Sequence, residues 1–168
     1  MDESGAKTNL TRLCGRAPKG ERVHAHAPGG NWHTTTMISS IRLDGSTACM
    51  ALEGTTDTES FRAYVSAVLV PTLRPGDLVV MDNLSPHKSD PTLALIANAG
   101  AQAIFLPAYS PDFNPIEMAI SKVKTMLRKL AKRDVESLYD GVAQAMKSLT
   151  PANARAYMRH CKYSATIQ

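Results

Sequence analysis

Three acidic residues stand where carboxylates can do chemistry. Asp82 directly follows the apolar run LVVM, Glu117 lies in NPIE at the start of an apolar stripe, and Asp2 is the second residue. Two divalent cations about 3.5–4 Å apart need several hard oxygen ligands that converge from different elements. Such a pair activates water or a 3′-hydroxyl and stabilises the leaving oxygen in an in-line attack on phosphorus. Three carboxylates are a sufficient protein contribution, because magnesium keeps much of its water and takes other ligands from the substrate phosphate.

Each of these acids also has a structural interpretation. Asp82 begins DNLSP, which is a good turn sequence. Asn114 can cap a helix with Pro115 at its first position, which makes Glu117 the third residue of a near capping box. Asp2 taken alone suits a solvated tail. Only the three together favour a metal site over these separate roles.

Other polar residues support weaker hypotheses. His87 stands four residues after Asn83 and suits a turn, a substrate contact or a role in ordering the site. The histidines at positions 24, 26 and 33 do not show a zinc-ligand spacing. A basic run with no acid in it follows Glu117 and suits either a solvated helix face or contact with a nucleic-acid backbone. Its members are Lys122, Lys124, Arg128, Lys129, Lys132 and Arg133.

Composition and charge restrict the class of protein. The chain has 168 residues, 43% of them apolar and 20% charged, which suits one soluble domain. It has no apolar run of about 18 residues, no visible secretory signal and three widely spaced cysteines, so we expect no membrane partner and a reducing cytoplasm. Residues 1–31 carry five basic and three acidic residues, residues 32–116 four and eight, and residues 117–168 ten and four. Basic ends around an acidic centre suit either plain solvated surface or a polyanionic substrate handled by metal-binding carboxylates.

The elements that must position these residues alternate between strands and helices. Residues 34–43 and 46–54 predict a β-hairpin around Asp44-Gly45, and residues 15–23 could hold an edge strand. Continuous apolar runs at 78–81 and 101–107 predict strands buried on both faces. Helical spacing or capping signals predict helices at 58–73, 91–99, 116–130, 134–149 and 152–160. The order predicts a mixed α/β layer fold.

The motifs around the three acids resemble one family. "DES", "MDNLSPHK" and "LPAYSPDFNPIE" are similar to the D-D-E transposase domain of the Tc/mariner superfamily, in particular its bacterial insertion-sequence branch. Asp82 and Glu117 are separated by 34 residues (117 − 82 − 1), which is the gap characteristic of that branch. "GRAPKGERV", "EGTTD", "LRPGDLVVMDN" and "TPANARAYMRHCKY" extend the resemblance over nearly the whole chain.

This resemblance implies a ribonuclease-H-like fold, with a mixed five-stranded sheet flanked by helices and a truncated first strand. Asp2 would end the first strand, Asp82 the fourth, and Glu117 would stand on the helix after the fifth. These three would bind two magnesium ions, with manganese as a substitute, and Asn83, His87 and Asn114 would support them. Residues 1–168 would form a single catalytic domain, with the truncated strand and a basic loop in 1–31 and C-terminal helices in 134–168.

The implied reaction is hydrolysis at the ends of a DNA element, followed by attack of the freed 3′-hydroxyl on target DNA. The implied partners are double-stranded DNA, a second copy in a DNA-bound homodimer, and an upstream helix-turn-helix half of the transposase. The expected location is the bacterial cytoplasm, at the nucleoid when DNA is bound. The chain would be the catalytic part, either the product of a second reading frame or a fragment. The alternatives are an inactive DNA-binding remnant and another ribonuclease-H-like nuclease.

Overall fold

A three-stranded antiparallel sheet carries the first of the three acids. In the computed structural model, which describes residues 1–30 and 32–163, β1 (Asp2–Lys7) pairs with β2 (Thr34–Ile41), and β2 pairs with β3 (Thr47–Glu53). Asp2 lies opposite Ser39, which in turn lies opposite Cys49. The expected hairpin is confirmed: Gly45 has a positive φ of 86°, a backbone conformation that glycine adopts without strain. Asp44 Oδ1 accepts from the backbone N–H of Ser46 at 2.8 Å.

A second, parallel sheet carries the second acid. It contains β4 (Leu78–Met81) and β5 (Gln102–Phe105), joined by a crossover through α2 (Asp90–Asn98). The five expected strands are therefore present, but backbone pairing divides them into two sheets. The two sheets meet where the Met1 nitrogen donates to the Val80 carbonyl oxygen at 2.6 Å.

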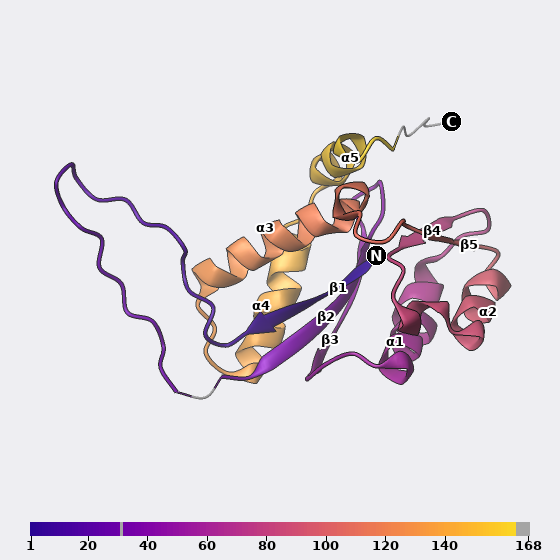
Figure 1. Ribbon diagram of the computed structural model, residues 1–168, viewed down its shortest axis with the longest axis horizontal. Helices are drawn as coiled ribbons and strands as arrows, with labels where there is room; N and C mark the ends of the chain where they lie inside the picture. Colours follow the sequence, from indigo (N-terminus) through magenta and orange to yellow (C-terminus); the bar gives the residue numbers. More distant parts are fainter. Residues whose placement is uncertain (31, 164–168) are drawn as a thin grey trace.

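Helices cover both faces of the three-stranded sheet (Figure 1). One core lies against α3 (Pro115–Leu130) and α4 (Val135–Lys147), and α5 (Pro151–His160) packs beside it. The other core lies against α1 (Thr58–Tyr64), which continues through a π-helical turn, Val65–Leu69, and a 3₁₀ turn, Val70–Thr72. Successive residues of a strand point to opposite faces, so Met37 joins the first core and Ile38 the second.

Capping residues explain where these helices begin, and the spacing of apolar residues explains which face of each helix is buried. Asp57 caps α1 by accepting from the backbone N–H of Ser60 at 2.8 Å. The predicted stripe of α3 is buried at Ile116, Ile120, Val123 and Leu127, and Leu130 is half-buried. This stripe fixes the rotation of α3 about its axis and therefore the direction in which its first turn points.

Three expectations about strands are wrong. Residues 15–23 form no strand, and the segment between β1 and β2 projects away from the body (Figure 1), because its many glycines, prolines and charges offer little apolar surface to bury. Asp2 begins β1 rather than ending it. β4 and β5 are not buried on both faces, since Leu78 is 60% and Ile104 37% exposed. Within the residues described, the helices are too short or too polar to cross a membrane.

Candidate active site

Asp2 is held from two sides at the start of β1. Its side chain is only 8% exposed, and it lies on the face of the sheet that α3 covers. Oδ1 accepts from the backbone N–H of Glu3 at 2.7 Å, and Oδ2 accepts from Asn114 Nδ2 at 3.1 Å. Two donors fix the orientation of this carboxyl group, so its position depends on the strand and on the residue just before α3.

Glu117 meets Asp2 from the first turn of α3. The two carboxyl groups lie within hydrogen-bonding reach of each other, although Glu117 itself is exposed to solvent. Burial raises the pKa of Asp2 to about 7; the contact with Glu117 and the charges of Glu117 and Asp82 act in the same direction, against the N–H of Glu3.

Asp82 follows β4 directly and is partly exposed. Its charge reaches Asp2, which places the three predicted acids within electrostatic range of one another. Its Oδ1, however, lies 2.6 Å from Nδ1 of His87 and also accepts from the backbone N–H of Leu84 at 3.3 Å. The contact with His87 lacks the alignment that a hydrogen bond requires. Asp82 is therefore turned partly toward His87.

His87 links two acids from beneath the site. Its ring is fully buried and stacks on Phe61 with centroids 4.1 Å apart. Nε2 lies 3.2 Å from Oε1 of Glu3, while Nδ1 faces Asp82. Burial by itself would lower the pKa of His87, but the carboxylates of Glu3 and Asp82 outweigh burial and raise it. The ring of His87 therefore lies between Glu3 of β1 and Asp82 at the end of β4.

The sequence analysis did not predict that Glu3 contacts His87. Strand alternation predicts that Glu3 points away from Asp2, and it does. The opposite face of the sheet is not exposed to solvent, because α1 covers it. On that face the Glu3 carboxylate contacts His87. The motif DN-x-x-x-H shows that a histidine follows the second acid, but not which residue of β1 it would meet.

Asn114 and Asn83 differ in what they do. Asn114 precedes α3 but makes no side-chain cap bond, so the predicted near capping box does not form. Instead, the Nδ2 of Asn114 donates a hydrogen bond to Asp2, and the buried Oδ1 of Asn114 has no hydrogen-bond partner. Asn83 is exposed in the segment after β4. Of the two, Asn114 is the one that orients an acid.

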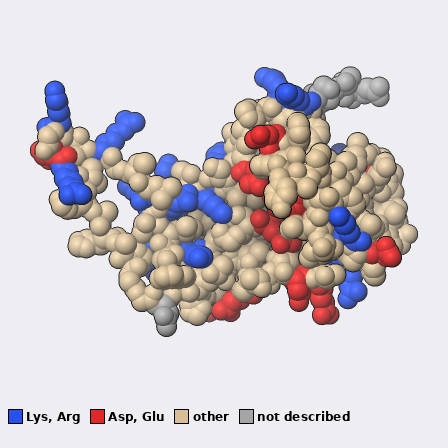
Figure 2. Space-filling model, viewed as in Figure 1, with Lys and Arg blue, Asp and Glu red and all other residues tan. Residues whose placement is uncertain are grey.

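The basic run lies along α3 and just beyond it. Figure 2 shows basic side chains over α3 and on the projecting segment, with acidic side chains gathered beside them in the middle of the same face. Lys122 Nζ donates to Ser148 O at 2.8 Å and to Asn153 Oδ1 at 2.6 Å, which ties α3 to α5. Arg133 donates to the carbonyl oxygens of Thr8 and Leu10 at 3.0 and 2.8 Å. Both cations make hydrogen bonds within the chain, although Arg133 is exposed, and Lys124, Arg128, Lys129 and Lys132 are the rest of the run.

The chemistry of the three acids fits a hard divalent cation. Asp2, Asp82 and Glu117 offer carboxylate oxygens, and the unpartnered Oδ1 of Asn114 adds a neutral one nearby. A cation would stabilise the carboxylate form of Asp2, which burial and, to a smaller extent, the charges of Glu117 and Asp82 disfavour. In residues 1–30 and 32–163 no set of three or more His, Cys, Asp or Glu side chains already encloses a metal position.

Comparison with known proteins bears on the fold and the family of the chain. The chain is similar to a solved structure named "Mos1 transposase paired-end complex with left transposon end", with a TM-score of 0.69 and 13% sequence identity. The likeness covers 94% of this chain and 50% of that one, so this chain spans half of that protein's length, and at this identity it shows the fold. The ribonuclease-H-like α/β fold expected from the sequence is thereby confirmed. No curated protein matches the chain. A family profile described as "DDE superfamily endonuclease" matches residues 1–139, and the chain belongs to that family.

Proposed function

We propose that the chain is the catalytic domain of an insertion-sequence transposase, which cuts DNA at the element's ends and joins them to target DNA. The observation that carries this proposal is the convergence of Asp2, Glu117 and Asp82 from β1, α3 and the end of β4. Burial of Asp2 and the nearby charges of Glu117 and Asp82 make a site that a divalent cation would stabilise. A structural role alone would not bring three acids together where one of them is buried.

In the proposed site, Asp2, Asp82 and Glu117 hold the cations. Two divalent ions, magnesium with manganese as a substitute, would supply activation of the attacking water or 3′-hydroxyl and stabilisation of the leaving oxygen. Asn114 orients Asp2 through its Nδ2 bond, and His87 fixes the distance between β1 and Asp82. Each strand scission or joining exchanges one P–O bond for another, so it needs no covalent bond between enzyme and DNA.

The basic surface supports DNA as the substrate. Lys124, Arg128, Lys129 and Lys132 follow Glu117 along or just beyond α3, so a duplex that placed a phosphate near the acids could lie along this helix. The projecting segment adds Arg12, Arg16, Lys19 and Arg22, all exposed. We further propose that the chain acts in a DNA-bound homodimer, with an upstream helix-turn-helix half that reads the element's ends, at the nucleoid in the cytoplasm.

One observation favours a second candidate, a DNA-binding remnant without catalysis. Asp82 Oδ1 lies against His87, and no closed set of ligands exists among the described residues. In that case the chain would bind DNA through its basic surface, with strong dependence on salt and little dependence on sequence. The two candidates differ only in what divalent metal does.

Plasmid nicking with the 168-residue chain separates them. We expect manganese- or magnesium-dependent conversion of supercoiled to open-circular DNA, lost in Asp82→Asn and in Glu117→Gln. The matched controls are Asp90→Asn and Glu136→Gln, which change exposed acids on α2 and α4. Calorimetric titration with manganese gives a second readout, since the two site variants should also lose metal affinity.

Three results would contradict the proposal. Nicking that survives in both site variants would remove the acids from the chemistry. DNA binding without cleavage or metal binding by the unaltered chain would favour the remnant. Faster cleavage of an RNA–DNA hybrid than of duplex DNA would instead indicate a different ribonuclease-H-like nuclease.

A further inference from the structure

Residues 106–114 connect β5 to α3 and are held at both ends beside the candidate site. At their start, the backbone N–H of Leu106 donates at 2.8 Å to the carbonyl oxygen of Met81, the residue directly before the second acid. At their end, the side chain of Asn114 donates to Asp2. We call residues 106–114 the β5–α3 connection. Its two ends are therefore tied to the strands that carry two of the three acids.

Tyr109 stands in the middle of the β5–α3 connection with its side chain in solvent. It is 103% exposed, so its ring is as accessible as in an extended chain. Its φ is 56°, in the left-handed region that residues other than glycine rarely occupy. Elsewhere in the described residues, Ala131 and Lys162 share this conformation, but they stand just after α3 and α5, where it commonly ends a helix. Tyr109 follows a strand, so neither burial nor helix termination explains an aromatic residue at this strained position.

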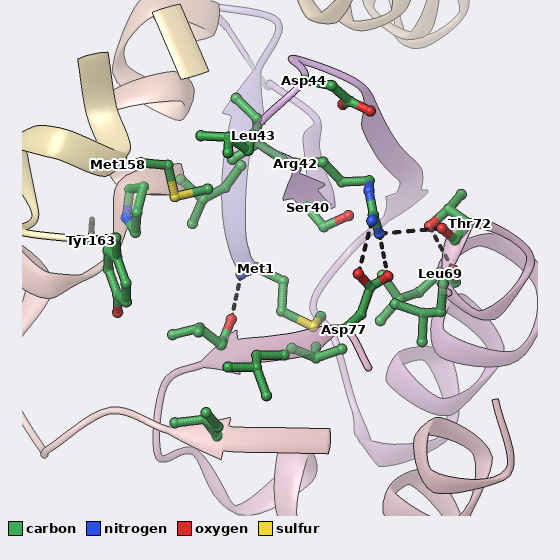
Figure 3. A pocket seen from close by; sticks show the side chains of 18 of the residues that line it. Met1, Ser40, Arg42, Leu43, Asp44, Leu69, Thr72, Asp77, Met158 and Tyr163 are labelled. Carbon is green, nitrogen blue, oxygen red and sulfur yellow. Dashed lines mark hydrogen bonds and ion pairs between the residues drawn. The ribbon is translucent and has the colours of Figure 1, made fainter. Parts of the chain in front are cut away.

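Two further apolar side chains are exposed close to the acids. Leu84 is 49% exposed, and its backbone N–H donates to Asp82 Oδ1 at 3.3 Å. Phe113 is 43% exposed, and its carbonyl oxygen accepts at 2.9 Å from the hydroxyl of Tyr163, which is labelled in Figure 3. β4 and β5 are parallel, so the segments that follow them leave from the same edge of their sheet, where α/β proteins bind ligands. We call Leu84, Tyr109 and Phe113 the apolar rim.

A nucleotide combines the two kinds of chemistry that the acids and the apolar rim offer. Its phosphate suits metal-loaded carboxylates, and its base presents an apolar face that stacks on aromatic side chains. A base inside a duplex has both faces covered by its neighbours, so only a base that has left the stack can use Tyr109. The Cα of Tyr109 lies at most about 11 Å from that of Leu106, because each residue spans at most about 3.6 Å. The ring is therefore within reach of the nucleotides next to a phosphate held at the acids.

We propose that Tyr109 is a substrate-binding residue that stacks on an unpaired base beside the scissile phosphate, with Leu84 and Phe113 as the apolar surroundings of that base. The inference rests on the proposed function, because it takes DNA as the substrate. Stacking fixes the strand on one side of the phosphate, while the basic side chains of α3 contact the backbone. The apolar rim thereby favours DNA with a base out of the stack over a fully paired duplex.

The test compares two DNA duplexes that differ by one base. One carries a single bulged thymidine and the other a bulged abasic nucleotide, so both have the same phosphates and the same interruption of pairing. A fluorophore at the far end reports binding to the 168-residue chain by anisotropy, in EDTA so that no metal-dependent cleavage takes place. We expect the thymidine duplex to bind about tenfold more tightly, and Tyr109→Ala to remove this preference. Tyr109→Trp should keep the preference and Tyr109→Leu should lose it, because a flat aromatic face is what stacks.

Two further variants separate base binding from folding. Tyr139→Ala, on α4, is the matched tyrosine control and should keep the preference of the unaltered chain. Tyr109→Gly should lose the preference and yet unfold at no lower urea concentration than the unaltered chain, because glycine adopts a positive φ without strain. A purely structural role for Tyr109 would not distinguish the two duplexes.

Several results would overturn the inference. Equal binding of the two duplexes by the unaltered chain, or an unchanged preference in Tyr109→Ala, would remove Tyr109 from base binding. A preference that Tyr109→Leu retains would replace stacking by a plain apolar contact. Self-association that Tyr109→Ala abolishes, with both duplexes bound alike, would assign the apolar rim to a contact between copies of the chain.

Plasmid nicking distinguishes the failure of this inference from the failure of the proposed function. Metal-dependent nicking by a chain without the base preference would overturn the inference alone. The base preference in a chain that does not nick DNA with any divalent metal would overturn the proposed function alone.

Discussion

Replacing Asp2 by asparagine should abolish any metal-dependent activity and yet stabilise the metal-free protein above neutral pH. Asp2 is buried beside Glu117, with the charge of Asp82 in range, and its pKa is raised to about 7. A raised folded-state pKa contributes stability that is present below the unfolded value, 3.8, and is lost as the pH rises through about 7. The asparagine removes the charge that this loss depends on.

The size of the effect follows from the pKa of Asp2. A change from 3.8 to about 7 corresponds to an upper value of about 4 kcal/mol, at about 1.4 kcal/mol per pH unit. Asparagine has one oxygen where the carboxylate offers two to the donors of Glu3 and Asn114, so one hydrogen bond is lost, about 1 kcal/mol. We therefore expect Asp2→Asn to be more stable than the unaltered chain by about 2–3 kcal/mol at pH 8.

Urea unfolding in EDTA at several pH values between 4 and 8 measures this difference. The unaltered chain should lose stability as the pH rises, Asp2→Asn should lose much less, and Asp140→Asn, an exposed acid on α4, should follow the unaltered chain. Added magnesium should restore stability to the unaltered chain and not to Asp2→Asn, because only a bound ligand stabilises by mass action. Parallel pH profiles for the unaltered chain and Asp2→Asn in EDTA would refute the reasoning.

Three further predictions concern the surroundings of the site. His87→Ala should lower the free energy of unfolding by about 2–4 kcal/mol in urea titrations, because it empties a buried space against Phe61; a change below about 0.5 kcal/mol would show that the ring is not packed as described. Arg42 holds the pKa of Asp77 below its ordinary value, so the ion pair stabilises the fold above about pH 4 and this contribution is lost as the pH falls further. Arg42→Met should remove that acid-side loss, about 0.5–1 kcal/mol for a partly exposed pair, in unfolding measured from pH 6 to 3. Lys129→Gln should reduce the slope of log K against log salt for duplex DNA by about 1, and an unchanged slope would remove Lys129 from the DNA surface.

The local elements could be predicted because each has a local cause. The Asp44-Gly45 turn sets the hairpin of β2 and β3, and Asp57 sets the start of α1. The apolar stripe that includes Ile116 and Leu127 sets both the extent and the rotation of α3. Each of these sequence signals involves only a few neighbouring residues. They can therefore be recognised without knowing what the helix or strand packs against.

The parts that were not predicted depend on partners far away in the chain. The strands that contain Leu78 and Ile104 were predicted to be buried on both faces, but these two residues are 60% and 37% exposed. Asn114 reads as a helix cap, yet its amide serves Asp2, 112 residues away. Glu3 reads as an outward neighbour and meets His87 instead, 84 residues away. The spacing of residues along the chain does not indicate which distant residues will come into contact.

The two carboxylates of β1 explain why one strand positions both sides of the candidate site. Alternation sends Asp2 to α3 and Glu3 to His87, so the position of one strand sets both the contact with Glu117 and the bridge to Asp82. That strand is paired with β2 along its length, and toward β4 it is held by the contact of Met1 with Val80. A shift of β1 by one residue would exchange the faces of Asp2 and Glu3 and remove both contacts. The register of β1 on β2 therefore sets the geometry of the three acids.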